Sequence, residues 1–192
     1  MRKGIFFAIL DLFGKFSFPN RSIKATVKTM KVEPIFKTEN NFLFFISDGK
    51  QADAANFEKI NISWSTVELD DEVYNEDFLA KLRDSLKALE AQNKFAILIP
   101  VIDKSFETCE QKEAFINAMN HTARRVKDCT SVAGFELNGE LLKDGLSANT
   151  TAASFMETLC KKHPQYVYFV KKTDITAFNL TELTSLFSIA TY

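Results

Sequence analysis

Two glutamates and an asparagine gather at the end of one apolar segment of the sequence. The segment GFELNGEL, residues 134–141, starts with the alternation typical of a strand and then breaks into a turn that contains a glycine. Glu136 lies in the alternating part, whereas Asn138 and Glu140 lie in the turn. In α/β folds, catalytic and ligand-binding carboxylates lie at the carboxyl ends of parallel strands. Acidic residues are also common in solvated turns, so the octet alone leaves both interpretations open.

Three further residues follow predicted strands and are candidates for the same end of a sheet. Trp64 ends the second strand and could stack on a sugar ring, or it could be an ordinary core residue. Asp48 follows the first strand and Asp103 follows the third, so both are expected to line the mouth at which Glu140 lies. For each aspartate, the other interpretation is a solvated loop position.

These residues need elements that bring strand ends together, and the hydrophobic pattern predicts such elements. Apolar runs predict strands near residues 43–47, 60–64, 95–101, 132–137 and 166–170. Amphipathic helices are predicted between them, around residues 75–93, 115–126 and 151–162. Asn179 and Glu182 form a capping-box pattern, which predicts a last short helix ending near Phe187.

Strands and helices that alternate in this way indicate (β/α) units with a mainly parallel sheet. We therefore predict an α/β fold whose strands are neighbours in chain order, as in an incomplete or small TIM barrel. The chain has 192 residues, fewer than the about 250 that a full barrel needs. Residues 1–40 are predicted to be a β-rich N-terminal extension with a hairpin, and residues 41–192 one TIM-barrel-like domain.

Composition argues against several classes of partner and cofactor. The net charge is −1 and no basic patch is visible, which argues against nucleic acid as the main partner. The three cysteines form no CxxC pair, and neither histidine lies at a metal-ligand spacing from them, so no metal site is expected. The chain contains no glycine-rich nucleotide loop and no GxSxG elbow, and no cofactor is predicted.

The N-terminus carries an apolar run after two basic residues, MRKGIFFAILDLFGKF. Asp11 and Lys15 interrupt this run, which is too short for a membrane span and shorter than a typical signal-peptide core. A cytoplasmic location is therefore predicted, with export as the alternative. Sequons occur at five asparagines, and without a clear export signal we interpret them as an effect of composition: Asn20, Asn61, Asn120, Asn149 and Asn179.

The chain resembles the cellulase-like family 5 glycoside hydrolases over about residues 42–170. The stretch from INISW to LIPVID is similar to the second and third βα units of that family, and FINAMNHTARRVKDCTSVAGFELNGEL to the next unit. The most specific part is Val132 to Glu140, where the family has a V-x-G-[FY]-E-L-x-N-E-P phrase. The resemblance implies a TIM barrel and places Glu140 on the family's general acid/base.

The sequence also departs from the family pattern at the implied site. Gly139 stands where the family has the asparagine that binds the sugar's 2-hydroxyl, and Leu141 replaces the usual proline. Asn61 and Val101 stand near positions of a supporting arginine and histidine. The family's nucleophile comes from a seventh strand, which the predicted strands do not reach. Glu136 would face the same side as Glu140 if the strand stayed regular, which is not the opposed geometry of glycoside cleavage.

Three functions remain compatible with the sequence. The first is a degenerate glycoside-hydrolase-like protein that binds a carbohydrate or a protein partner with weak or no hydrolysis. The second is an active hydrolase with Glu140 as acid/base and a second carboxylate from Asp48, Asp103 or another subunit. The third is a non-enzymatic module that forms a homodimer through the open edges of its sheet, because unpaired edges must be covered or paired.

Overall fold

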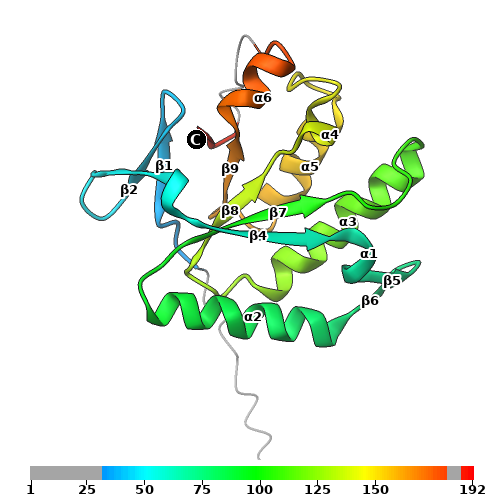
Figure 1. Cartoon of the computed structure of the whole chain (residues 1–192), viewed down its shortest axis with the longest axis horizontal. Coiled ribbons are helices and arrows are strands. Elements are labelled where there is room, and N and C mark those ends of the chain that lie inside the picture. The colour runs from blue at the N-terminus through cyan, green and yellow to red at the C-terminus, as the bar shows by residue number, and fades with distance from the viewer. Residues whose placement is uncertain (1–31, 181–186) are drawn as a thin grey trace, which may run out of the picture. The chain divides into compact units, whose positions relative to one another are not determined.

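The computed structural model describes residues 32–180 and 187–192 (Figure 1). A five-stranded parallel sheet forms its centre, in the order β10-β9-β8-β7-β4. Its strands are β4 (Glu58–Ser63), β7 (Ala96–Val101), β8 (Val132–Glu136), β9 (Val167–Val170) and β10 (Ile189–Thr191). They are therefore neighbours in chain order and all parallel, which confirms the predicted α/β fold.

The remaining elements flank this sheet. The helices are η1 (Ala54–Asn56), α1 (Trp64–Val67), α2 (Glu76–Ala91), α3 (Cys109–Arg125), α4 (Gly139–Leu142), α5 (Thr151–Cys160) and α6 (Lys172–Ala177). Strands β5 (Glu68–Asp70) and β6 (Val73–Tyr74) form a small hairpin. Strands β1 (Phe36–Glu39), β2 (Phe42–Phe45) and β3 (Gln51–Ala52) form an antiparallel sheet, which we call the meander.

The sequence-based prediction assigned one strand to the wrong sheet. The strand predicted near residues 43–47 is β2 of the meander, and the fifth strand of the parallel sheet is β10 instead. Asn40 and Asn41 both have positive φ, at 50° and 63°, as a two-residue type I′ hairpin turn requires. This tight turn pairs β2 with β1 in antiparallel fashion, so the apolar run of β2 enters the meander and no helical crossover follows it.

Helices α2, α3 and α5 cover one face of the parallel sheet. Each begins at a side-chain cap: Asn75 for α2, Thr108 for α3 and Thr150 for α5. The apolar face of α2 buries Leu79, Leu82 and Leu86 against the sheet, and Phe78 and Leu89 lie partly buried beside them. The core on this side also contains buried residues of every strand of the parallel sheet, from Ile62 to Ile189.

The meander covers the opposite face of the same sheet (Figure 1). Its buried residues pack with the alternate, inward-facing side chains of the strands, in a cluster of Phe36, Leu43, Ala52, Ala54, Ile97, Ala133, Val167, Phe169 and Ala190. The ring centroid of Phe36 lies 5.0 Å from that of Phe45 and 4.9 Å from that of Phe95. Five phenylalanines thus contribute to the core between the meander and the parallel sheet: Phe36, Phe45, Phe57, Phe95 and Phe169.

Gly134 allows β8 and β9 to approach each other closely. The pairing of β7 with β8 shifts in register between Ala96 and Ile97, and Gly134 follows this irregularity. A Cβ atom on Gly134 would lie 1.7 Å from the backbone oxygen of Val167. A side chain at this position is therefore incompatible with the observed strand spacing.

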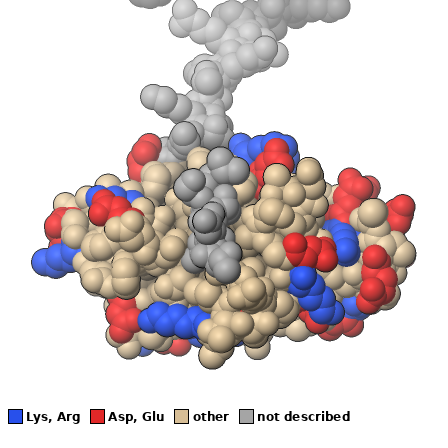
Figure 2. Space-filling model, turned by 90° about the horizontal axis from the view of Figure 1, so that it is seen from above, with Lys and Arg blue, Asp and Glu red and all other residues tan. Residues whose placement is uncertain are grey.

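Two predictions fall outside the described residues. The hairpin predicted within residues 1–40 involves residues 1–31, and the predicted last helix falls on residues 181–186. The division of the chain at residue 40 stays a prediction. Of the helices in residues 32–180 and 187–192, none is long and apolar enough to cross a membrane. Acidic and basic side chains are mixed on the face shown in Figure 2.

Candidate functional site

Asp103 ties together the carboxyl ends of β4 and β7. Its Oδ1 accepts a hydrogen bond from the backbone nitrogen of Ser65 at 2.9 Å, and its Oδ2 accepts from the hydroxyls of Ser63 and Ser65. Partial burial raises the pKa of Asp103, but these hydrogen bonds outweigh burial and the net pKa is lowered. The carboxylate is therefore an ionised anchor of the strand ends.

Asn138 caps α4 at the end of β8. Its Oδ1 accepts from the backbone nitrogen of Leu141 at 3.1 Å, and its Nδ2 donates to the backbone oxygen of Pro100 at 2.6 Å. Both ends of the amide are thus occupied in holding the loop after β8 against β7. A role of Asn138 in binding a ligand stays a prediction.

Glu136 is buried on the meander side of the sheet, with its side chain 1% exposed. Its Oε1 lies 2.9 Å from Nζ of Lys171, and its Oε2 accepts a hydrogen bond from the hydroxyl of Tyr192. Burial, together with the hydrogen bond to Glu136 and its negative charge, raises the pKa of Tyr192, so the phenol remains a donor. Nζ of Lys59 lies 4.8 Å from the centroid of the Tyr192 ring. A residue of β4 thus meets one beyond β10 across the concave face of the sheet.

Glu140 lies outside this buried network. The strand ends at Glu136 and α4 begins at Gly139, so the regular strand that would place both glutamates on one face does not continue. The Glu140 side chain is 49% exposed, and its Oε2 lies 2.5 Å from Nζ of Lys143. Its role as an acid/base stays a prediction.

Trp64 occupies a core position at the start of α1. The residue is 3% exposed, and its ring lies 5.6 Å from that of Phe115 and 6.5 Å from that of Phe106. Its Nε1 donates to Oε2 of Glu68 at 2.5 Å. In this conformation the indole presents no open face, so stacking on a sugar would require α1 to move.

Asp48 lies far from the other candidates, in the turn between β2 and β3. The oxygen of Asn41, just before β2, accepts from the nitrogen of Thr191 at the carboxyl end of β10. The ring of Phe45, at the other end of β2, lies 5.7 Å from Phe95, which precedes β7. The turn that follows β2 is therefore at the amino end of the parallel sheet. Contrary to the expectation from sequence, the structure separates Asp48 from Asp103, because β2 is not part of the parallel sheet.

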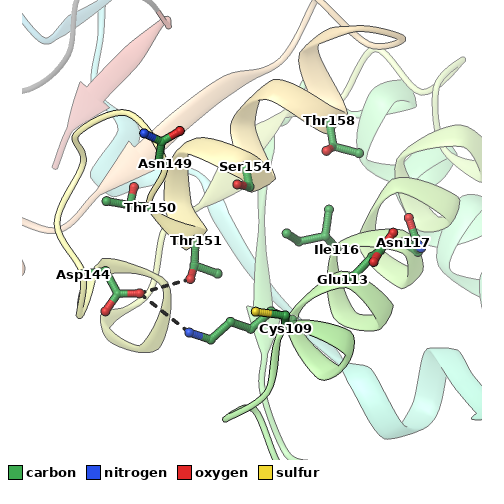
Figure 3. A pocket seen from close by; sticks show the side chains of 11 residues that line it. Cys109, Glu113, Ile116, Asn117, Asp144, Asn149, Thr150, Thr151, Ser154 and Thr158 are labelled. Atoms are coloured by element: carbon green, nitrogen blue, oxygen red, sulfur yellow. Dashed lines mark hydrogen bonds and ion pairs between the residues drawn. The ribbon is translucent and has the colours of Figure 1, made fainter.

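Sequence reasoning did not identify two pockets that the fold creates. The first, of about 440 Å³, lies between α3, α5 and the segment after α4 (Figure 3). We call it the rim pocket. In it Oδ2 of Asp144 lies 3.7 Å from Nζ of Lys112 and accepts a hydrogen bond from the hydroxyl of Thr151 at 3.2 Å. Its other lining residues are mostly small and polar, including Asn117, Ser154 and Thr158, which face the pocket from the two helices (Figure 3).

The second pocket, of about 370 Å³, lies between the meander, η1 and the end of β10. We call it the meander cleft. Its lining is Phe42, Leu43, Gln51, Ala52, Asp53, Ala54, Ala55, Lys172, Thr191 and Tyr192. These residues come from segments far apart in the sequence, so no local motif announces the cleft. The one local signal was the apolar run at residues 42–46, from which Phe42 and Ile46 remain exposed in the structure.

Potential metal ligands are dispersed in the part of the chain that the structure describes. No group of three or more His, Cys, Asp or Glu side chains there is placed to hold a metal ion. The three cysteines are free thiols, with Cys109 exposed, Cys160 half-buried and Cys129 buried. Burial raises the pKa of Cys129 to about 11, which keeps this thiol protonated and unreactive.

Comparison with known proteins yields similarity only at the level of solved structures. No family model and no curated protein matches the chain. Endo-glycoceramidase II from Rhodococcus sp., in a cellobiose-like isofagomine complex, is 14% identical over 60% of this chain and 41% of its own, with a TM-score of 0.49. A GH5_18 protein from Bifidobacterium longum subsp. infantis is 11% identical over 58% of this chain and 33% of its own, with a TM-score of 0.44. The chain thus spans less than half the length of either structure.

Proposed function

We propose that this chain is a glycoside-hydrolase-like protein that binds a saccharide and hydrolyses it weakly or not at all. One observation carries the proposal: the two glutamates at the end of β8 are each paired with a lysine and lie in different surroundings. Glycoside cleavage needs two carboxyl groups that face each other across the bond, about 5–5.5 Å apart for retention and about 6.5–9.5 Å apart for inversion. A buried Glu136 and an exposed Glu140 on a separate helix do not supply that pair.

The contacts of Glu136 oppose catalysis by this residue. A general acid must reach the leaving oxygen and must hold a proton near neutral pH. Both oxygens of Glu136 are engaged, one by an ammonium group and one by a phenol, and almost none of the side chain is exposed. With both oxygens occupied and the side chain buried, Glu136 has no atom free to contact the leaving oxygen of a substrate.

The test compares hydrolysis and binding in the same protein preparations. We expect turnover of aryl β-glycosides and soluble β-glucan far below the roughly 1–10³ s⁻¹ of ordinary enzymes. We also expect Glu140→Gln to leave any trace activity unchanged, while affinity electrophoresis in gels containing soluble β-glucan shows retarded migration of the wild type. Ordinary turnover that Glu140→Gln abolishes would show that the chain is an active hydrolase.

A free sheet edge favours a second role, self-association. Strand β4 is six residues long and, within the described residues, pairs only with β7. Such an edge can pair with another chain. We propose a homodimer joined through β4. Light scattering should give twice the monomer mass, and Asn61→Pro, which removes one outward N–H group from the edge, should restore the monomer. A monomeric wild type at high concentration would refute this role.

A further inference from the structure

We propose that the meander cleft is the saccharide-binding surface, with the ring of Phe42 as its stacking platform. This inference rests on the proposed function and specifies where and how the ligand binds. It places the site on the meander, where Tyr192 separates the ligand from Glu136 and where Glu140 is not part of the lining.

Phe42 is exposed although it belongs to an apolar strand. Alternation along β2 turns Leu43 into the core, where it is 3% exposed, and leaves Phe42 on the outer side, 49% exposed. Four large hydrophobic residues in the described part of the chain are similarly exposed: Phe42, Ile46, Leu69 and Val73. Of these only Phe42 lines the meander cleft, and none of the four lines the rim pocket. An exposed aromatic ring at the wall of a cleft offers the apolar contact that the face of a sugar ring requires.

The polar groups of the cleft suit a neutral ligand rich in hydroxyl groups. Asp53 caps η1, with its Oδ1 accepting from the nitrogen of Ala55 at 3.1 Å and its Oδ2 from Nδ2 of Asn56 at 3.0 Å. These bonds fix the carboxylate and leave further acceptor capacity on both oxygens. Lys172 is exposed and makes no ion pair with any described residue, so its ammonium group is available as a donor. One carboxylate and one ammonium give no net charge, which disfavours an anion such as phosphate.

The floor of the cleft is held in place before any ligand binds. Tyr192 lines the cleft, its hydroxyl donates to the buried Glu136, and its ring lies 4.8 Å from Nζ of Lys59. A floor that is already ordered reduces the entropic cost of binding. The rim pocket is a weaker candidate, because its lining contains no aromatic residue and its lysine is paired with Asp144.

The experiment compares two substitutions on the same segment. Phe42→Ala and Ile46→Ala each remove a half-exposed apolar side chain, but Ile46 does not line the cleft. Titration calorimetry with cello-oligosaccharides and affinity electrophoresis with soluble β-glucan measure binding. We expect Phe42→Ala to weaken binding about 10-fold and Ile46→Ala to leave it within about 2-fold. Far-ultraviolet circular dichroism checks that both variants fold.

A second variant tests the polar half of the cleft. Lys172→Ala should also weaken binding, whereas Lys162→Ala, on the opposite side of the sheet, should not. If the wild type binds saccharide and Phe42→Ala binds equally well, the cleft is not the site, although the proposed function stands. If the wild type binds neither probe, the proposed function fails and the site fails with it.

Discussion

His163 should make the stability of the fold sensitive to mild acid. The residue is 4% exposed, and its Nε2 has no hydrogen-bond partner among the described residues. Burial, and then the positive charges of Lys127, Lys162 and Arg124, lower the pKa of His163 from 6.5 to about 4. The unfolded chain therefore takes up a proton near pH 6.5, while the folded chain stays neutral at this site until about pH 4. Because the unfolded state binds more protons in this window, stability is lost as the pH falls through it.

The expected loss follows from the size of the shift. A change from 6.5 to about 4 corresponds to about 3 kcal/mol once both states are protonated, and about 2 kcal/mol is already lost at about pH 5. Urea unfolding, followed by circular dichroism at about pH 7.5 and about pH 5, measures this difference before most carboxylates titrate.

Two variants isolate the contribution of His163. In His163→Gln the loss between the two pH values should shrink by about 2 kcal/mol, whatever the variant's stability at neutral pH. The second variant, His121→Gln, changes the other histidine of the chain, and its loss between the two pH values is compared with that of His163→Gln. An unchanged pH dependence in His163→Gln would refute the assignment of the effect to this burial.

Three further substitutions test the architecture, each by urea unfolding at neutral pH. Gly134→Ala should lower the free energy of unfolding by about 3 kcal/mol or more, because the new methyl group meets the backbone of β9. A loss below about 1 kcal/mol would show that β8 and β9 can move apart to accommodate it. Lys171→Met should cost about 2 kcal/mol by leaving the buried Glu136 without its cation, and Glu136→Gln in the same chain should recover part of this loss. Trp64→Phe should cost about 1–3 kcal/mol through the lost hydrogen bond to Glu68, and a neutral effect would indicate that water replaces the indole.

The parallel core could be predicted from the sequence because its pattern is local and repeated. Apolar strands of four to six residues alternate with helices whose apolar residues recur every three or four positions, and both periods survive in the structure. Helix α2 is the clearest example, because Leu82 and Leu86 of its predicted stripe are buried in the core. Chain order of the strands then follows from the right-handed connections that such units require.

The meander could not be assigned in the same way, because an apolar run does not say which sheet receives it. The run at 42–46 has the composition of a parallel strand, whereas its pairing depends on the turn at Asn40 and Asn41. The short strand β10 carries too little pattern to be detected. Because β2 was assigned to the parallel sheet, the prediction placed Asp48 at the wrong end of that sheet. For the same reason it did not reveal the meander cleft.

The sequence predicted where the candidate residues lie along the strands, but it did not predict which side chains surround them. The sequence placed Glu136, Asn138 and Asp103 at strand ends, and the structure has them there. Their partners lie far away in the chain: Lys171 for Glu136, Pro100 for Asn138, and Ser63 and Ser65 for Asp103. No local sequence pattern reveals these long-range partners. The partners determine whether a polar side chain is used in structural hydrogen bonds or is free to bind a ligand.

The contact between the meander and β10 also bears on how the chain reaches its native state. Thr191 bonds to Asn41 across 150 residues of sequence, and the buried Phe36 and Leu43 of the meander pack in one cluster with Ala133, Val167, Phe169 and Ala190 from the later strands. Contacts between residues this far apart require the chain to lose loop-closure entropy before the contact energy stabilises the fold. They therefore form more slowly than the local contacts of a helix. During synthesis, Phe36 and Leu43 leave the ribosome long before Val167 and Phe169 can cover them. Among the described elements, we therefore expect the meander to stay exposed to chaperones and to aggregation until the last strands are in place.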